Sequence, residues 1–313
     1  MNVEAPANKY HRYDRYDPKA QSRIVQLTRN RLDKLQTHFV HGLLSSDMTH
    51  ALLEPGKTQG FTTEELKHLK RIPNSYLEQP TAQLDTLDPR SKHLVYKISA
   101  GGVAALVDSG RIRIEDAILW KRLQQNNGPF RHDAGTGYIT ASIALGAKAA
   151  GYRFIPWFEI LNHQYCKTKD SPNPIEITYR LHGKSHAFVP DQIFGLGRGG
   201  ERPIFYALET DMGTEQLEEH KLKHSTLAAK YKAYREMWAN ALHTKHYGVT
   251  EMRLLVVANK TFRLENIKEA FRRVANEDAH QGAGPVIFKA VPQLDHRNNQ
   301  KPPATGHLFD VLK

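Results

Sequence analysis

Three acidic residues occupy positions where two neighbouring strands would bring them together. Residues 187–209 predict a β-hairpin, because two strand-like runs flank a glycine-rich turn. If the hairpin turns symmetrically at Gly199 and Gly200, the numbers of paired residues add up to about 400, which sets Asp191 opposite Glu209. Asp211 lies two residues beyond Glu209 and shares its face of the strand if the strand continues that far. The spacing therefore predicts three carboxylates in one place.

Such a group of carboxylates would bind a hard cation. Like charges this close repel one another unless a cation lies between them or protons are taken up. Ligand sets made of carboxylate oxygens suit Mg²⁺ or Mn²⁺, and either ion would activate water against a phosphodiester. Two alternatives stay open: the acids are surface charges at strand ends, or a register slip of one residue turns them apart.

The composition indicates a polyanionic partner. The chain has 313 residues, with 44 lysines and arginines against 33 acidic residues, and a formal net charge of +11. Its single cysteine, Cys166, excludes an internal disulfide framework and a cysteine-rich zinc module. No apolar run is long enough for a membrane span, and the polar N-terminus has no secretory signal, so we expect a cytoplasmic protein without membrane contact.

The first half of the chain predicts a winged helix-turn-helix domain. Residues 1–21 lack periodicity and are expected to form a flexible, basic and aromatic tail. Three helices, the second capped by Ser45 or Ser46 and the third by Thr62, are followed by two strands. The predicted helices cover residues 22–44, 46–53 and 62–72, and the predicted strands cover 75–78 and 93–99. A breaker at 126–129 ends this domain, which we place at 22–127.

Basic and polar side chains on the third helix and the ribbon are the candidate DNA contacts. They are Lys67, Lys70, Arg71, Asn74, Lys92 and Lys97. Phosphate and base contacts would divide among them. The alternative is that they form an ordinary solvated helix face.

The second half, residues 128–313, predicts a mixed sheet flanked by helices. Helices are expected at 136–150, 225–243 and 264–274, and strands at 153–161, 175–181, 187–196, 203–209, 252–258 and 285–291. The whole chain is therefore expected to be an α/β (α+β) protein.

Two levels of resemblance follow from the acidic motifs. Pro190-Asp191 followed by Glu209-Thr210-Asp211 resembles the signature of PD-(D/E)XK nucleases. More specifically, the replication-relaxation family of plasmid and mobile-element proteins, which includes the C-class conjugative relaxases, is similar to the chain in the segments VPDQIFGL, FYALETDMGT, KYKAY and RLLVVANKTFRLENI. The similarity extends over about residues 24–274. It implies a winged helix followed by a PD-(D/E)XK restriction-endonuclease-like domain with a Mg²⁺ site.

The chain departs from the nuclease signature at one position. Asp211 stands where those nucleases have lysine, and the resemblance assigns the lysine role to Lys230, with Tyr234 one helical turn later. Lys221 and Lys223 are competing candidates. The same resemblance makes His132 a candidate accessory residue.

Glu159 is a further candidate accessory residue, as a fourth carboxylate. Partial burial beside Trp157 and plain exposure are its alternatives.

Two functions are favoured by these features over a third, a basic protein that acts on RNA, because a winged helix fits the major groove of B-form DNA better than that of A-form RNA. The first is a Mg²⁺-dependent, site-specific DNA nicking endonuclease, relaxase-like, that acts on double-stranded DNA with other mobilisation or replication proteins. The second is a non-catalytic DNA-binding regulator or replication accessory protein that retains the nuclease fold.

Overall fold

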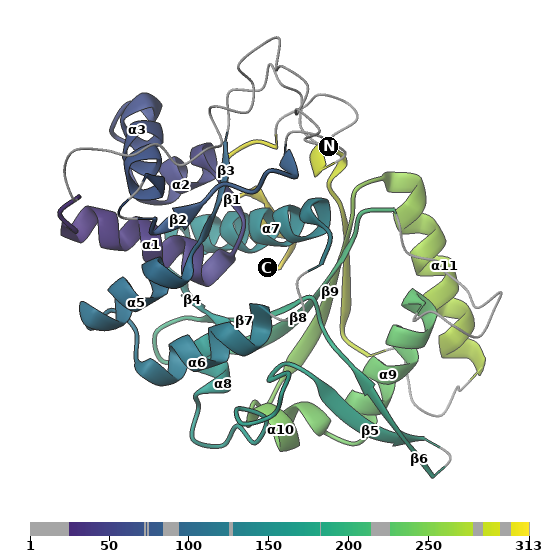
Figure 1. Ribbon diagram of the computed structural model, residues 1–313. Helices are drawn as coiled ribbons and strands as arrows, with labels where there is room; N and C mark the ends of the chain where they lie inside the picture. The colour runs from purple at the N-terminus through teal and green to yellow at the C-terminus, as the bar shows by residue number, and fades with distance from the viewer. Residues whose placement is uncertain are drawn as a thin grey trace, which may run out of the picture. The chain divides into compact units, whose positions relative to one another are not determined.

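The computed structural model describes residues 25–71, 73, 75–83, 94–124, 128–181, 183–213, 226–277, 284–294 and 302–312 (Figure 1). The predicted tail at 1–21 lies outside these residues. The chain divides into two compact units, Met1–Arg111 and Ile112–Lys313. The sequence places the boundary at 126–129, whereas here helix α6 (Ile114–Leu123) is part of the second unit.

The first unit contains helices and a small antiparallel sheet. Its helices are α1 (Arg29–His41), α2 (Ser46–Leu53), α3 (Gln59–Lys70) and α5 (Ala100–Asp108). Its described strands β1 (Leu44–Ser45), β2 (Leu77–Glu78) and β3 (Val95–Ile98) form a sheet in the order β1-β3-β2. The Ser45 hydroxyl accepts a hydrogen bond of 3.2 Å from the Met48 amide, which confirms Ser45 as the cap of α2.

The start of α3 differs from the expectation. The helix begins at Gln59 after Thr58, so Thr62 lies inside it and is not its cap. The Thr62 hydroxyl instead donates a 2.6 Å hydrogen bond to Glu54 Oε2. A threonine three residues before a glutamate is the local signal for a cap, but here a buried carboxylate takes the hydroxyl.

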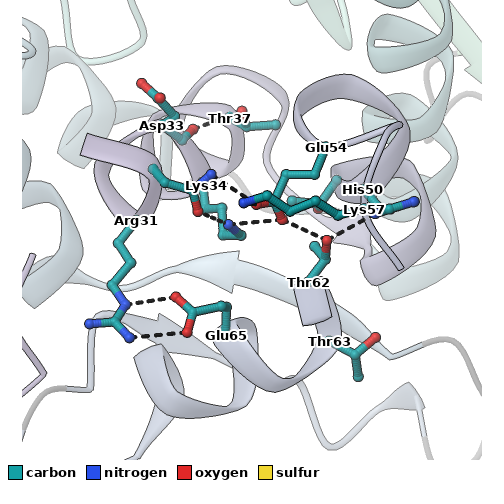
Figure 2. Close-up of polar contacts among 12 residues, drawn as sticks. Arg31, Asp33, Lys34, Thr37, His50, Glu54, Lys57, Thr62, Thr63 and Glu65 are labelled. Carbon is teal, nitrogen blue, oxygen red and sulfur yellow. Dashed lines mark hydrogen bonds and ion pairs between the residues drawn. The ribbon is translucent and has the colours of Figure 1, made fainter. Parts of the chain in front are cut away.

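Glu54 is the buried centre of a polar cluster, the Glu54 cluster, formed with Asn30, Lys34, Lys57 and Thr62. Lys34 is 0% exposed, and its ammonium lies 3.0 Å from Glu54 Oε2. Glu54 Oε1 accepts hydrogen bonds from Asn30 (2.8 Å) and Lys57 (2.9 Å). Figure 2 shows Lys34, Lys57 and Thr62 turned toward this carboxylate.

Burial acts to raise the pKa of Glu54, but the hydrogen bonds from Thr62, Lys57, Lys34 and Asn30 outweigh it and hold the pKa at about 2. The cluster therefore joins α1, the end of α2 and α3 through one charged group. Arg31 on α1 adds a bidentate ion pair with Glu65 on α3, at 2.7 and 3.0 Å.

The second unit is built on a mixed sheet with described strand order β10-β9-β8-β7-β4. Its strands are β4 (Arg153–Ile155), β7 (Gln192–Gly197), β8 (Ile204–Asp211), β9 (Met252–Ala258) and β10 (Val286–Ala290). The β4–β7 and β7–β8 pairs are antiparallel, and the β8–β9 and β9–β10 pairs are parallel. A separate hairpin joins β5 (Ile177–Leu181) and β6 (Lys184–Phe188).

Helices cover both faces of this sheet. Figure 1 shows α7 (Phe130–Ala149) on one side and α9 (Leu227–Ala239) with α11 (Thr261–Glu277) on the other. The alternation along β8 agrees: Thr210 bonds to Thr136 on α7, and Glu209 bonds to Lys230 on α9. Short helices α8 (Trp157–Leu161) and α10 (Leu242–Tyr247) and 3-10 turns at Pro292–Leu294 and His307–Val311 complete the described elements.

The register of the β7–β8 hairpin is the predicted one. Gln192 pairs with Leu208 and Leu196 with Ile204, and β8 continues through Asp211. Asp191, directly before β7, donates its backbone N–H to the Leu208 carbonyl at 3.0 Å. The predicted hairpin is therefore confirmed.

Two predicted strands are interrupted by prolines. The segment 153–161 forms only β4, because Pro156 ends the strand and stands at the N-cap of α8. The segment 187–196 is likewise divided, with Phe188 ending β6, Pro190 in the break and Gln192 starting β7.

Within the described residues, every helix is too short or too polar to cross a lipid bilayer.

Candidate active site

Glu209 is the buried acid of the site. It lies on β8, is 2% exposed, and faces α9. The Lys230 ammonium donates to Glu209 Oε2 at 2.8 Å, and the Tyr234 hydroxyl donates to Oε1 at 2.7 Å. Thr226 caps α9 by accepting from the Ala229 amide at 3.1 Å, which fixes the start of the helix that carries both donors.

The electrostatics of Glu209 are set by burial and by its charged neighbours. Burial raises its pKa to about 7, the Lys230 charge opposes this rise, and the Asp191 charge adds to it. A carboxyl group with such a pKa exchanges a proton near neutral pH, a property that is common at functional sites.

Asp191 lies on the neighbouring strand end and is held by three groups. Its Oδ2 accepts from the Thr210 backbone amide at 2.6 Å and lies 2.9 Å from His132 Nε2. Its Oδ1 is 3.8 Å from the Lys230 ammonium. Burial acts to raise the pKa of Asp191, but the His132 hydrogen bond and the Lys230 charge hold it below its ordinary value. Lys230 therefore bridges Asp191 and Glu209.

His132 acts in this site as a cation. It lies in the first turn of α7, with Nδ1 3.3 Å from Asp133 Oδ1 and Nε2 on Asp191. Burial lowers its pKa, but hydrogen bonds to Asp133 and Asp191 dominate and raise the pKa to about 10. The imidazolium thus orients Asp191 and balances its charge at neutral pH.

Asp211 does not join Asp191 and Glu209 in one group of carboxylates, contrary to the prediction from the sequence. It is 1% exposed, its Oδ2 lies 2.5 Å from Arg263 Nε, and its Oδ1 accepts from the Gly213 amide at 2.6 Å. Both oxygens are therefore engaged by donors other than Lys230. In the described parts of the chain, no group of three or more histidine, cysteine, aspartate or glutamate side chains is arranged to hold a metal ion.

Two predicted accessory residues differ in outcome. Tyr234 reaches the site through its bond to Glu209. Glu159 does not, because it lies on α8 and pairs with Arg153 in a largely exposed ion pair. Lys221 and Lys223 lie outside the described residues.

The predicted DNA contacts of the first unit also separate into groups. Lys70 is buried at 6% exposure and donates to Gln79 Oε1 at 2.7 Å, so it does not face solvent as expected. Lys67 is partly exposed and pairs with Glu64 at 2.6 Å, and Lys97 pairs with Glu78 across the sheet at 3.1 Å. Arg71 is half-buried at the end of α3. Asn74 and Lys92 lie outside the described residues.

Arg263 is a partner of Asp211, beside the candidate site, that the sequence did not predict. It contacts Asp211 because β9 pairs in parallel with β8, with Ala258 opposite Asp211, and α11 begins directly afterwards. The available signal was the buried strand at 252–258 followed closely by an arginine. The sequence did not show that this strand pairs with β8, because the two strands are not adjacent along the chain.

A hard divalent cation fits Asp191 and Glu209 as a pair. Mg²⁺ in proteins is commonly held by one or two carboxylates, with water and substrate phosphate completing its shell. Both acids supply only oxygen, and the Lys230 ammonium between them, at 2.8 and 3.8 Å, marks a place where positive charge is stabilised. Asp211, already paired with Arg263, does not belong to this ligand set.

The described residues thus define an α+β protein whose mixed-sheet unit carries an aspartate–glutamate–lysine centre with a buried glutamate and a largely shielded aspartate and lysine. The family model of replication-relaxation proteins matches residues 35–252, and the chain belongs to this family. No curated protein and no solved structure matches the chain. Family membership indicates a role in replication or mobilisation.

Proposed function

We propose that the protein is a metal-dependent DNA endonuclease that nicks one strand at a specific site during replication or mobilisation of a mobile element. The observation that carries the proposal is the Asp191–Lys230–Glu209 bridge, with 3.8 and 2.8 Å between the ammonium and the two carboxylates. Two acids on adjacent strands with a lysine between them support the assignment of a PD-(D/E)XK-like domain.

Each residue of the centre has a definite role in this proposal. Asp191 and Glu209 would hold Mg²⁺ or Mn²⁺, which supplies Lewis acidity toward the phosphodiester and lowers the pKa of a water molecule. Lys230 orients the attacking water and offsets the negative charge that develops on phosphorus. His132 keeps Asp191 in place, and Tyr234 keeps Glu209 in place.

The first unit would hold the duplex. The order α1, β1, α2, α3, β2, β3 supports a winged helix-turn-helix, in which α3 enters the major groove. Of the predicted DNA contacts, Lys67 and Arg71 at the end of α3 and Lys97 on β3 would contact phosphates, with Lys67 and Lys97 exchanging their surface ion pairs for the DNA backbone. Other replication or mobilisation proteins are the expected partners at the same DNA.

Cleavage of supercoiled plasmid tests the proposal. The plasmid would carry the native DNA that flanks the coding sequence, and incubation with Mg²⁺ or Mn²⁺ should convert it to open circles, whereas EDTA should prevent this. Asp191→Asn and Glu209→Gln should each abolish nicking. Glu159→Gln is the matched control, because this carboxylate pairs with Arg153 outside the centre and its loss should leave nicking unchanged. Nicking that persists in the Asp191→Asn, Glu209→Gln double variant would exclude both acids from the mechanism.

The second candidate function, a non-catalytic DNA-binding regulator or replication accessory protein, is favoured by one observation. The carboxylates already have protein cations beside them: Lys230 and His132 at Asp191, Lys230 at Glu209, and Arg263 at Asp211. Under this function, plasmid with the recognised site stays intact in Mg²⁺ and Mn²⁺, while footprinting detects protection at that site.

A further inference from the structure

Phe262 is a largely exposed aromatic residue at the beginning of α11. Its exposed fraction is 64%, and the Lys260 ammonium lies 5.5 Å from the centre of its ring. The neighbouring Thr261, Glu265 and Asn266 are exposed and polar. An isolated ring among polar groups is too small an apolar surface for stable protein docking, but its size matches one nucleobase.

The segment that carries Phe262 begins beside the candidate active site. Ala258 at the end of β9 pairs with Asp211 at the end of β8, and the Asn259 amide donates to the Asp211 carbonyl at 3.1 Å. Arg263, the residue after Phe262, lies 2.5 Å from Asp211 Oδ2. Asp211 is two residues from Glu209, a separation of roughly 7 Å along a strand. The ring is therefore attached to the same sheet end as the acids.

The charge around the ring favours a nucleic acid. Lys260 lies over the ring itself, and the chain as a whole carries a formal net charge of +11. Proteins that hold single strands combine cations that follow the backbone with aromatic rings on which bases stack. In a duplex, the faces of each base are covered by its neighbours, so a ring of this kind contacts bases that are unpaired or at an end.

We propose that Phe262, with Lys260, is a stacking platform for an unpaired DNA base beside the phosphodiester that the Asp191–Glu209 centre cuts. The inference rests on the proposed function, because the bound strand is the one that the Asp191–Glu209 centre would cut. The substrate of the second unit is then single-stranded or locally melted DNA. The duplex contacts remain with the first unit.

The test measures binding without cleavage. Fluorescence anisotropy in EDTA would compare full-length wild type, Phe262→Ala and Phe262→Trp on a single-stranded oligonucleotide and on its duplex. Loss of the ring should weaken single-strand binding about 5- to 100-fold and leave duplex binding unchanged, and tryptophan should restore the affinity. An oligonucleotide with 2-aminopurine should show fluorescence quenching on binding wild type that Phe262→Ala removes.

Tyr165→Ala is the matched control. Tyr165 is 63% exposed, lies in the same unit, and packs on His163 in the segment after α8. Its removal should not change single-strand affinity. The proposal is overturned if Phe262→Ala binds the single strand as wild type does, or if it loses duplex and single-strand affinity equally.

The two proposals fail separately. If plasmid is never nicked but Phe262→Ala loses single-strand affinity, base stacking on Phe262 is supported and the nicking activity is excluded. If plasmid is nicked and Phe262→Ala binds the single strand as wild type does, the nicking activity is supported and base stacking on Phe262 is excluded.

Discussion

Replacing Glu54 by glutamine should strongly destabilise the first unit. Glu54 and Lys34 are both almost fully buried and lie 3.0 Å apart, and the variant would leave the Lys34 charge without its carboxylate. Burial already lowers the pKa of Lys34, so the remaining ammonium has few ways to regain solvation.

The magnitude follows from the pKa of Glu54. A fall from 4.5 to about 2 corresponds to a stabilisation on the order of 3 kcal/mol at neutral pH, at about 1.4 kcal/mol per pKa unit. Because the folded-state pKa is below the unfolded value, this stability is present above about pH 4.5 and is lost as the pH falls through about 2. The difference between wild type and Glu54→Gln should therefore shrink over the same interval.

Hydrogen exchange with mass spectrometry measures this effect in the full-length protein. Peptides from α1, α2 and α3 should exchange about 100-fold faster in Glu54→Gln at pH 7, as a loss of about 3 kcal/mol requires. Glu64→Gln is the matched control, because Glu64 lies on α3 in an exposed pair with Lys67 and should change stability by less than about 0.5 kcal/mol. Equal effects of the two substitutions, or a loss that does not shrink between pH 4.5 and 2, would show that the ionised Glu54 carboxylate does not stabilise the first unit in this way.

Three further substitutions test the site. Lys230→Met should destabilise the second unit by about 3 kcal/mol because it removes the cation between the buried Glu209 carboxylate and the largely shielded Asp191 carboxylate. Urea unfolding followed by tryptophan fluorescence measures this, because all three tryptophans of the chain lie in the second unit. An equal loss in the control Lys232→Met, an exposed lysine of the same helix, would exclude the site as the cause. Tyr234→Phe removes the donor to Glu209 Oε1 and should cost about 1–3 kcal/mol in thermal unfolding; an unchanged melting temperature would contradict this role. Arg263→Met should cost about 3–5 kcal/mol, and adding Asp211→Asn should recover a large part of it; purely additive losses would show that the two side chains do not depend on each other.

Local signals predicted the part of the site that is close in sequence. The glycine-rich turn at 197–200 fixes the β7–β8 register, because a short antiparallel connection leaves few alternative pairings. Asp191 and Glu209 therefore come together as expected. The choice of Lys230 came from the family resemblance, and its spacing from Tyr234 puts both side chains on the helix face that contacts Glu209.

Contacts between distant segments could not be predicted in the same way. The pairing of Asp211 with Arg263 depends on the parallel β8–β9 contact, which carries no local sequence mark. Thr62 has the same capping signal as a true cap, and only the burial of Glu54 decides where its hydroxyl bonds. Lys70 has the sequence features of a solvent-facing lysine, but tertiary packing buries it against Gln79.

In the proposed function, Asp191 and Glu209 form one cation site, and Asp211 stands apart from it. Anomalous diffraction from a crystal soaked in Mn²⁺ tests this most directly. We expect a manganese peak at about 2.0–2.2 Å from oxygens of both Asp191 and Glu209, with Lys230 displaced from the position between them. A peak bound to Asp211 in place of these two residues, or no peak at their carboxylates, would contradict it.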